Sequence, residues 1–290
     1  MASIVQLDHL RLITVTGPDR DQFLQGQLTQ DIARLGSATT SLGGWADARG
    51  RLLWAGHLFR RADSICLVAA AAAANALAAR LKLFVLRSRV QIACPELHLN
   101  GCLDARGADR TAPSDCDPQV IALAADPTRE LIVAGPGSAS PGPASAPGGA
   151  TDEWRLRDIR TGIPEIVPAT SGEFVPQMVN LDLLDGISFS KGCYTGQEIV
   201  ARTRFLGRVK RRMLRFAVMG TPPPHGATVH AGHGSIGQVV NAVQTATHTS
   251  ELLAVIRLEA ATGACSLDAD GSRPLTRLAL PYDIPELAGG

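Results

Sequence analysis

Residues 191–198 read Lys-Gly-Cys-Tyr-Thr-Gly-Gln-Glu, so a cation, a thiol, a phenol, an amide and a carboxylate stand within a single short stretch. The last four positions fit a capping box, in which a threonine hydroxyl and a glutamate side chain satisfy the free backbone N–H groups at a helix start. This pattern predicts a helix that begins at Gly196. The apolar residues 199–201 continue it as a buried helix.

Cys193 stands two residues after Lys191 and two before the predicted cap. The neighbouring ammonium and the positive end of the helix dipole both favour a reactive thiolate over the thiol. Gly192 leaves the backbone beside the sulfur uncovered, so a ligand could approach closely. The alternative is a small buried cysteine beside a turn glycine, because unpaired cysteines are among the most buried residues. The residues alone leave both interpretations open.

The length of 290 residues and the 45% hydrophobic content predict about two globular domains with a sizeable core. A net charge of +1 excludes a global field that recruits nucleic acid or anionic membranes, so any anion site must be local. The longest apolar window, 67–79, is too short to span a bilayer. We therefore expect a soluble, cytoplasmic protein with no membrane partner.

The six cysteines form no C-x-x-C pair, which argues against a zinc site, an iron–sulfur ligand set and a disulfide framework. His225, His230 and His233 lie in a turn-rich stretch after three prolines, which favours surface loop histidines over metal ligands. No resident metal is predicted.

The first half of the chain has the pattern of an α+β protein. Strand signals cover 10–15, 84–93, 99–103 and 119–124, hairpin signals cover 43–60 and 52–69, and helix signals cover 19–36 and 70–81. An amide-rich face between Gln25 and Asp31 is expected to be solvated. Trp54 is expected to pack in the core, whereas Trp45, flanked by glycines, could stack on a planar ligand.

The second half begins with a loop rich in proline and glycine, 134–150, which is expected to be flexible. Thr151 should cap a helix that Gly162 ends, and its arginines, 155, 157 and 160, are expected mostly to face solvent. Short strands at 213–218, 227–230, 236–242 and 252–256 predict a small β-barrel or sandwich, with a domain boundary near Arg208. The basic run 202–212 is expected to be a hydrated face. It could also hold a polyanionic tail or touch RNA phosphates, but no aromatic interleaving supports an RNA-reading surface.

The chain resembles the YgfZ family, folate-binding proteins related to the aminomethyltransferase of the glycine cleavage system. Besides 191–198, the resemblance rests on 176–177, Asn180 and 186–189, and it extends to 17–31, 47–51 and 162–164. It implies an aminomethyltransferase-like α+β fold of two lobes and a C-terminal β-barrel around a central hole that binds tetrahydrofolate. Lobe one would comprise 1–44 and 151–205, lobe two 45–133, and the barrel 206–290.

The resemblance further implies a role in the synthesis or repair of particular iron–sulfur enzymes, including one that thiolates tRNA. The aminomethyltransferases carry no cysteine at the place of Cys193 and are typically longer, which argues against plain glycine cleavage. The implied partners are a reduced folate and, transiently, iron–sulfur client enzymes; direct nucleic-acid binding is not expected. Lys191 would activate Cys193, which could act as a nucleophile, a one-carbon acceptor or a transient sulfur or iron ligand.

Candidate folate contacts follow from the chemistry of the side chains near the motif. Gln197 and Glu198 suit the donor and acceptor edge of a pterin. Tyr194 or Trp45 could stack on the ring, and Arg202 or Arg204 could pair with the glutamate tail.

A second hypothesis is a tetrahydrofolate-dependent aminomethyltransferase or demethylase. Such an enzyme needs an acid near the pterin nitrogens, for which Asp31 or Asp47 are candidates. A non-catalytic scaffold that binds no folate is the third class.

Overall fold

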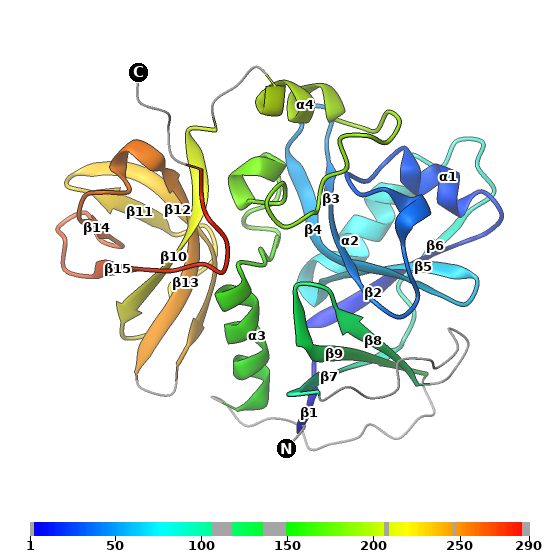
Figure 1. Ribbon diagram of the computed structural model, residues 1–290, viewed down its shortest axis with the longest axis horizontal. Coiled ribbons are helices and arrows are strands. Elements are labelled where there is room, and N and C mark those ends of the chain that lie inside the picture. The colour runs from blue at the N-terminus through cyan, green and yellow to red at the C-terminus, as the bar shows by residue number, and fades with distance from the viewer. Residues whose placement is uncertain (1–2, 106–117, 136–148, 206–208, 246–247, 286–290) are drawn as a thin grey trace.

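The computed structural model describes residues 3–105, 118–135, 149–205, 209–245 and 248–285. Its strands form a five-stranded sheet, a four-stranded sheet and a closed barrel. Helix α3 (Ala150–Thr161) runs between the barrel on one side and the two sheets on the other (Figure 1). Most of the predicted flexible loop, residues 136–148, lies outside the described residues.

The five-stranded sheet has the order β3 (Ser41–Ala46), β4 (Leu52–Arg61), β5 (Ser64–Ala70), β2 (Leu10–Thr16), β6 (Gln91–Ala93), with antiparallel neighbours. Helix α2 (Ala71–Lys82) packs against it, and these elements confirm the predicted hairpins and helix. Trp54 is buried as expected, and its indole N–H donates to the Val68 carbonyl at 2.9 Å. The strand expected over 84–93 shortens to β6.

The helix expected over 19–36 ends much earlier. Helix α1 (Arg20–Gln25) is followed by an irregular segment and the short 3₁₀ helix η1 (Ile32–Arg34). The Thr29 N–H donates to the Gly44 carbonyl at 2.8 Å, and Leu28 forms an isolated bridge with Trp45. Pairing with β3 thus replaces the helical hydrogen bonds, while Leu28 remains buried as the apolar periodicity required.

The four-stranded sheet has the order β1 (Ser3–Gln6), β7 (His98–Leu103), β9 (Asp126–Ala134), β8 (Gln119–Leu123). Strands β7 and β8 confirm the predicted ones, whereas β9 gave no clear sequence signal. The expected lobe boundary at residue 44 falls inside β3, and β2 pairs with β5 across the expected lobes. Hairpin pairing keeps β3, β4 and β5 together in one sheet, and the predicted division into lobes stays a prediction.

The C-terminal strands close into a barrel, as predicted. Its order is β10 (Arg211–Met219), β13 (Thr249–Arg257), β12 (Gly234–Gln244), β11 (Thr228–Ala231), β14 (Cys265–Ser266), β15 (Pro274–Leu278), and η3 (Leu258–Ala260) follows β13. Its core contains Leu214, Phe216, Val239 and Leu252. The predicted fold class is confirmed.

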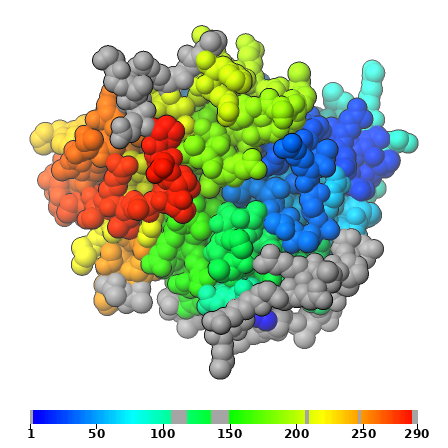
Figure 2. Space-filling view, viewed as in Figure 1, coloured from blue at the N-terminus to red at the C-terminus, as the bar shows by residue number. Residues whose placement is uncertain are grey.

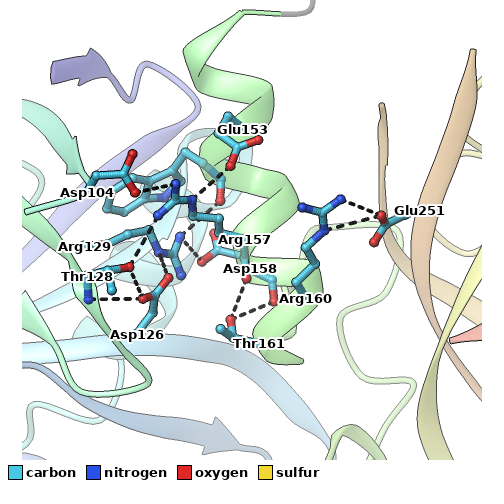
Figure 3. A network of polar contacts seen from close by, with 11 residues as sticks. Asp104, Asp126, Thr128, Arg129, Glu153, Arg157, Asp158, Arg160, Thr161 and Glu251 are labelled. Carbon is cyan, nitrogen blue, oxygen red and sulfur yellow. Dashed lines mark hydrogen bonds and ion pairs between the residues drawn. The ribbon is translucent and has the colours of Figure 1, made fainter. Parts of the chain in front are cut away.

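Helix α3 begins without the expected threonine cap. Gly149 is its N-cap, and the Thr151 hydroxyl instead donates to the Gln6 carbonyl at 3.3 Å. Gly162 ends the helix in the left-handed conformation, φ 75°, as predicted. Its arginines were expected to face solvent mostly, but Arg157 pairs with Asp104 at 2.8 Å, and Arg160 pairs with Glu251 of the barrel at 2.9 Å (Figure 3).

Arg129 of β9 joins this network from the opposite side (Figure 3). Its side chain is fully buried and bonds Asp126 and Asp158 at 2.8 Å each, and its guanidinium lies 4.6 Å from the Trp154 ring. Charged contacts therefore connect α3 to the four-stranded sheet and to the barrel. The spacing of arginines along a helix is the same whether their side chains face water or other parts of the protein. The sequence therefore did not predict that the α3 arginines form these contacts.

No helix of the described residues has both the length and the apolar character needed to cross a membrane.

Candidate functional site

The segment that contains the 191–198 motif is held against residues 25–31 by buried hydrogen bonds. The Thr29 hydroxyl donates to the Gly186 carbonyl at 2.6 Å and accepts from the Gly44 N–H at 2.8 Å. The Gln30 amide donates to the Asp185 and Leu42 carbonyls at 2.7 and 2.9 Å. The amide-rich stretch was expected to be solvated, but Thr29 and Gln30 are buried because they satisfy the backbone of this segment. We call residues 185–196 the thiol segment.

Lys191 points into the protein. Its ammonium donates to the carbonyls of Leu28 and Gln30, each at 2.8 Å, and lies 5.1 Å from the centre of the Tyr194 ring. Burial lowers the pKa of Lys191 to about 8, although Asp31 opposes the shift. The ammonium therefore fastens the thiol segment to the irregular stretch after α1. Activation of Cys193 by Lys191 stays a prediction.

Cys193 is exposed, unlike the other cysteines that the structure describes, which are buried or half-buried. Burial raises the pKa of the Cys66 thiol to about 11, so that thiol is held protonated. A side chain added at Gly192 would have no heavy atom within 4 Å, so the approach to Cys193 is open. The buried-cysteine alternative is excluded, and an accessible thiol remains.

The helix after the motif starts differently from the capping-box prediction. Helix α4 (Gln197–Phe205) begins one residue late because Gly196 is left-handed, φ 79°. The Gln197 side chain accepts from the Tyr194 N–H at 3.3 Å, and the Thr195 N–H donates to the Gly26 carbonyl at 3.1 Å. A side chain at Gly196 would meet the Asp47 carbonyl at 2.5 Å, so only glycine allows this contact with the β3–β4 turn.

The structure does not gather the expected folate contacts around one cavity. Trp45 and Tyr194 are buried, with exposed fractions of 2% and 7%, so neither ring face is open for stacking. Trp45 packs edge-on against Phe84, and burial raises the pKa of Tyr194 to about 12. Among the motif and α4 residues, the exposed side chains include Cys193, Glu198, Arg202, Arg204 and Phe205. The stacking predictions for the two buried rings are therefore not supported by this packing.

Asp31 and Asp47, the expected acids, serve local structure instead. Asp31 accepts from the Ala33 N–H at the start of η1 and from the Gln25 amide. Asp47 accepts from the N–H groups of Arg49 and Arg51 in the β3–β4 turn, each at 2.9 Å.

A cavity lies where the two sheets, α3 and the barrel meet, and we call it the central cavity. Its lining comes from β4, β5, β8, β9, α3, the segment after α3, and β12. The polar or charged side chains of the lining are His9, His57, Arg155, Asp158, Glu165, His225 and Asn241. His225, expected in a surface loop, donates its Nδ1–H to the Val240 carbonyl and turns Nε2 toward Glu165, 3.9 Å away.

Burial shifts the titration of four of these groups, two histidines and two carboxyl groups, toward their neutral forms. Desolvation, with a smaller contribution from nearby arginines, lowers the pKa of His9 and of His57 to about 3. Desolvation raises the pKa of Asp158 and of Glu165, against the opposing effect of Arg129 and Arg155 respectively. The cavity thus combines neutral imidazoles with carboxyl groups that retain protons more readily than usual.

Several polar atoms of the central cavity have no hydrogen-bond partner within the described residues. They include His9 Nδ1, His57 Nε2, Arg155 Nε and Asn241 Oδ1. Buried polar atoms are normally paired, so these atoms suit a ligand with both donors and acceptors. Sequence reasoning missed the site because its residues are far apart along the chain and form no local motif. No group of three or more His, Cys, Asp or Glu side chains in the described ranges is placed to hold a metal ion.

Comparisons with known proteins identify relatives of this chain. No protein-family model matches the chain. The chain is similar to the tRNA-modifying protein YgfZ of Cronobacter sakazakii, with 31% identity over 314 aligned positions that cover 98% of this chain and 94% of the relative. It is also similar to the YgfZ protein of Serratia proteamaculans, with 33% identity over 229 positions, 73% of this chain and 69% of the relative.

Among solved structures, the aminomethyltransferase T of the glycine cleavage system from Bartonella henselae has the same fold. The TM-score is 0.67 at 16% identity, over 97% of this chain and 86% of that one. This likeness supports the fold alone. The curated relatives, matched over nearly the full length of one of them, show that the chain belongs to the YgfZ family.

Proposed function

We propose that this protein binds tetrahydrofolate and supports the synthesis or repair of iron–sulfur enzymes, and thereby affects tRNA modification such as thiolation. Membership of a family whose relatives are named tRNA-modifying proteins supports the link to tRNA. The aminomethyltransferase fold supports the link to folate. Iron–sulfur client enzymes are the proposed transient partners.

The observation that carries the proposal is the exposed thiol of Cys193 on a rigid support. The Lys191 side chain before it and the Thr195 N–H after it bond the carbonyls of Leu28 and Gly26 and so fix the backbone on either side, whereas the Cys193 side chain is exposed. A cysteine that served packing would be buried. The exposed sulfur is available as a nucleophile, as a one-carbon acceptor, or as a transient ligand for sulfur or iron.

The polar side chains of the central cavity support a reduced folate as its ligand. The edge of a pterin offers N–H donors and ring acceptors, and the unpartnered atoms of His9, His57 and Asn241 offer matching groups. Glu165 would accept from the pterin, and Arg155 would pair with an anionic part of the ligand. Bound tetrahydrofolate supplies the capacity to carry a one-carbon unit. The placement of the tail on Arg202 or Arg204 stays a prediction.

A fluorescence titration with reduced folates tests the binding site. Trp154 lines the central cavity and is buried, so its emission should report an occupant. We expect saturable binding to the wild type, about ten-fold weaker binding to Glu165→Gln because a charged acceptor is lost, and unchanged binding to Cys193→Ala. Equal affinity for all three proteins would refute this site, and no binding to any of them would refute the folate proposal.

Complementation tests the thiol. In a bacterial strain that lacks its own member of the family, the wild-type gene should restore the level of thiolated tRNA. Cys193→Ala should fail although it folds and binds folate, whereas Cys265→Ala serves as a matched control for loss of a cysteine. Full restoration by Cys193→Ala would exclude a chemical role for this thiol.

A second candidate, a folate-dependent aminomethyltransferase or demethylase, is favoured by one observation. Burial raises the pKa of Glu165 in the central cavity, which favours a carboxyl group that can both donate and accept a proton. Formation of methylene-tetrahydrofolate from an aminomethyl donor, abolished in Glu165→Gln, would support it. Absence of turnover in a protein that binds folate would leave the accessory role.

A further inference from the structure

In the folded protein, residues from other parts of the chain lie beside the basic run 202–212. Its side chains Arg202, Arg204, Lys210 and Arg211 are exposed at the end of α4 and at the start of the barrel. These segments lie at the top of the molecule in Figures 1 and 2, where α4 covers the tips of β3 and β4. We call the set Arg51, Arg202, Arg204, Phe205, Lys210 and Arg211 the α4 face.

Aromatic rings accompany these cations once the chain is folded. The Arg204 guanidinium lies 4.0 Å from the centre of the Phe189 ring, which comes from the segment before the motif. Phe205 meets Phe189 edge-on at 6.3 Å between ring centres, yet 68% of Phe205 is exposed. The two contacts hold Phe205 in place without covering it. Phe205 therefore presents an exposed ring next to the Arg204 guanidinium, whose carbon lies 5.9 Å from its centre.

The β3–β4 turn extends the α4 face toward the barrel. A side chain at Gly50 would meet Ile199 of α4 at 2.8 Å, so the turn packs closely on the helix. Arg51 donates to the Glu173 carbonyl at 2.6 Å, and it lines a polar groove together with Arg211 and Gln238 of the barrel. Arginines from three separate parts of the chain are thereby placed along one surface.

Several of these cations have no acidic partner. Within the described ranges, the side chains of Arg202, Lys210 and Arg211 form no ion pair and no hydrogen bond, whereas Asp47 already accepts from the neighbouring turn. Glu173 and Glu198 are the acids nearby in sequence or groove, and they do not balance the cations. The whole chain has a net charge of only +1, so this local excess is a concentrated feature.

We propose that the α4 face binds RNA with an unpaired segment, its arginines on phosphates and Phe205 beneath an exposed base. Planar guanidinium groups match phosphate geometry, and base stacking on aromatic rings is the usual way to hold unpaired nucleotides. A protein partner fits less well, since the centre of a protein interface is depleted of charge and this face offers little apolar area besides Phe205. The expectation against RNA rested on the linear pattern, which does not show that Phe189 supports Arg204 and Phe205.

Fluorescence anisotropy with a labelled RNA stem–loop tests the proposal on the full-length protein. Affinity should fall with salt, and Arg202→Ala or Arg211→Ala should each reduce the salt slope by about one unit. Phe205→Ala should weaken stem–loop binding about ten-fold and leave binding of a blunt RNA duplex unchanged. The matched controls are Arg277→Ala, another exposed arginine on β15, and Leu86→Ala, an exposed apolar residue; both should bind as the wild type does.

Four outcomes would overturn the proposal: no binding at low salt, equal losses in the controls, equal effects of Phe205→Ala on both RNAs, or displacement of the RNA by polyglutamate at equal charge concentration. The last would indicate a general polyanion surface or an acidic protein partner. The inference goes beyond the folate proposal and is independent of it. A folate titration of Arg211→Ala and Phe205→Ala, which are not among the predicted folate contacts, should be unchanged, so the two proposals fail separately.

Discussion

The thiol segment and the central cavity differ in how their polar side chains are paired. Around the thiol segment, Thr29, Gln30 and Lys191 are all satisfied by backbone groups, and the Cys193 side chain is left exposed. In the central cavity, polar atoms of His9, His57 and Asn241 stay unpaired on the inside. The difference teaches that the same polar side chains can hold a surface segment in place when they are paired with backbone groups, or keep hydrogen-bonding capacity available inside a cavity when they are not.

The largest effect is expected at the wall of the central cavity. Arg129→Met would leave Asp126 and Asp158 without their buried cation, so the free energy of unfolding should fall by about 3–5 kcal/mol. Denaturant unfolding measures it. Arg157→Met, whose partners Asp104 and Glu153 are half-exposed or exposed, is the control and should cost about 1 kcal/mol or less. Similar losses in both variants would show that burial of Arg129 does not matter.

Lys191→Met should cost less, about 2–3 kcal/mol, because the carbonyls of Leu28 and Gln30 lose their donor in a buried place. The same variant tests the pKa of Lys191, about 8 against 10.5 in an unfolded chain. Between these pH values the unfolded wild type binds more protons than the folded one. Wild-type stability should therefore rise from pH 8 to pH 10.5, and Lys191→Met should lack this rise.

The histidines of the central cavity predict an acid-side effect. The pKa of His57 is about 3 when folded and 6.5 in the unfolded chain, so the unfolded chain binds the extra proton between these values. Stability should therefore fall as pH drops below 6.5, by about 1 kcal/mol for each pH unit from this residue. His57→Gln should reduce this dependence of the free energy of unfolding on pH. Urea unfolding at several pH values measures it. An unchanged slope would mean that His57 is protonated in the folded state.

The smallest effect is expected at Cys193. Because its side chain is exposed and its neighbours are satisfied without it, Cys193→Ala should change the free energy of unfolding by less than about 0.5 kcal/mol. Cys66→Ser, which places a hydroxyl in a buried site, should cost clearly more in the same assay. A large loss in Cys193→Ala would assign the thiol a structural role and remove the contrast between the two regions.

Local patterns predicted much of the fold. Strand alternation at 10–15 and in the barrel, the alanine-rich helix α2, and Gly162 as a helix end are all present. These features depend on neighbours along the chain, for which residue type is sufficient. The prediction of a helix over 19–36 was wrong at Leu28, because this residue pairs with β3 although the apolar spacing is helical. Periodicity predicted the burial of Leu28 correctly but not its backbone conformation.

The candidate sites were likewise predicted only in part from the sequence. The motif 191–198 singled out Cys193 because cation, thiol and glycine are adjacent in sequence, and the structure leaves that thiol accessible. It did not reveal that Lys191 bonds Leu28 and Gln30, since those carbonyls lie more than a hundred residues earlier. Trp45 looked like a stacking residue from its glycine neighbours, yet the core closes over it.

The sequence by itself determined the family motif, the exposed-thiol hypothesis and the barrel, because each depends on residues close together in the chain. Only the tertiary structure decided which polar groups are buried, which cations lack partners and where a cavity opens. His9, Glu165 and His225 meet because two sheets, a helix and a barrel pack around one point. Desolvation then lowers the pKa of His9 and raises that of Glu165, and it is a property of the surroundings that no single residue carries.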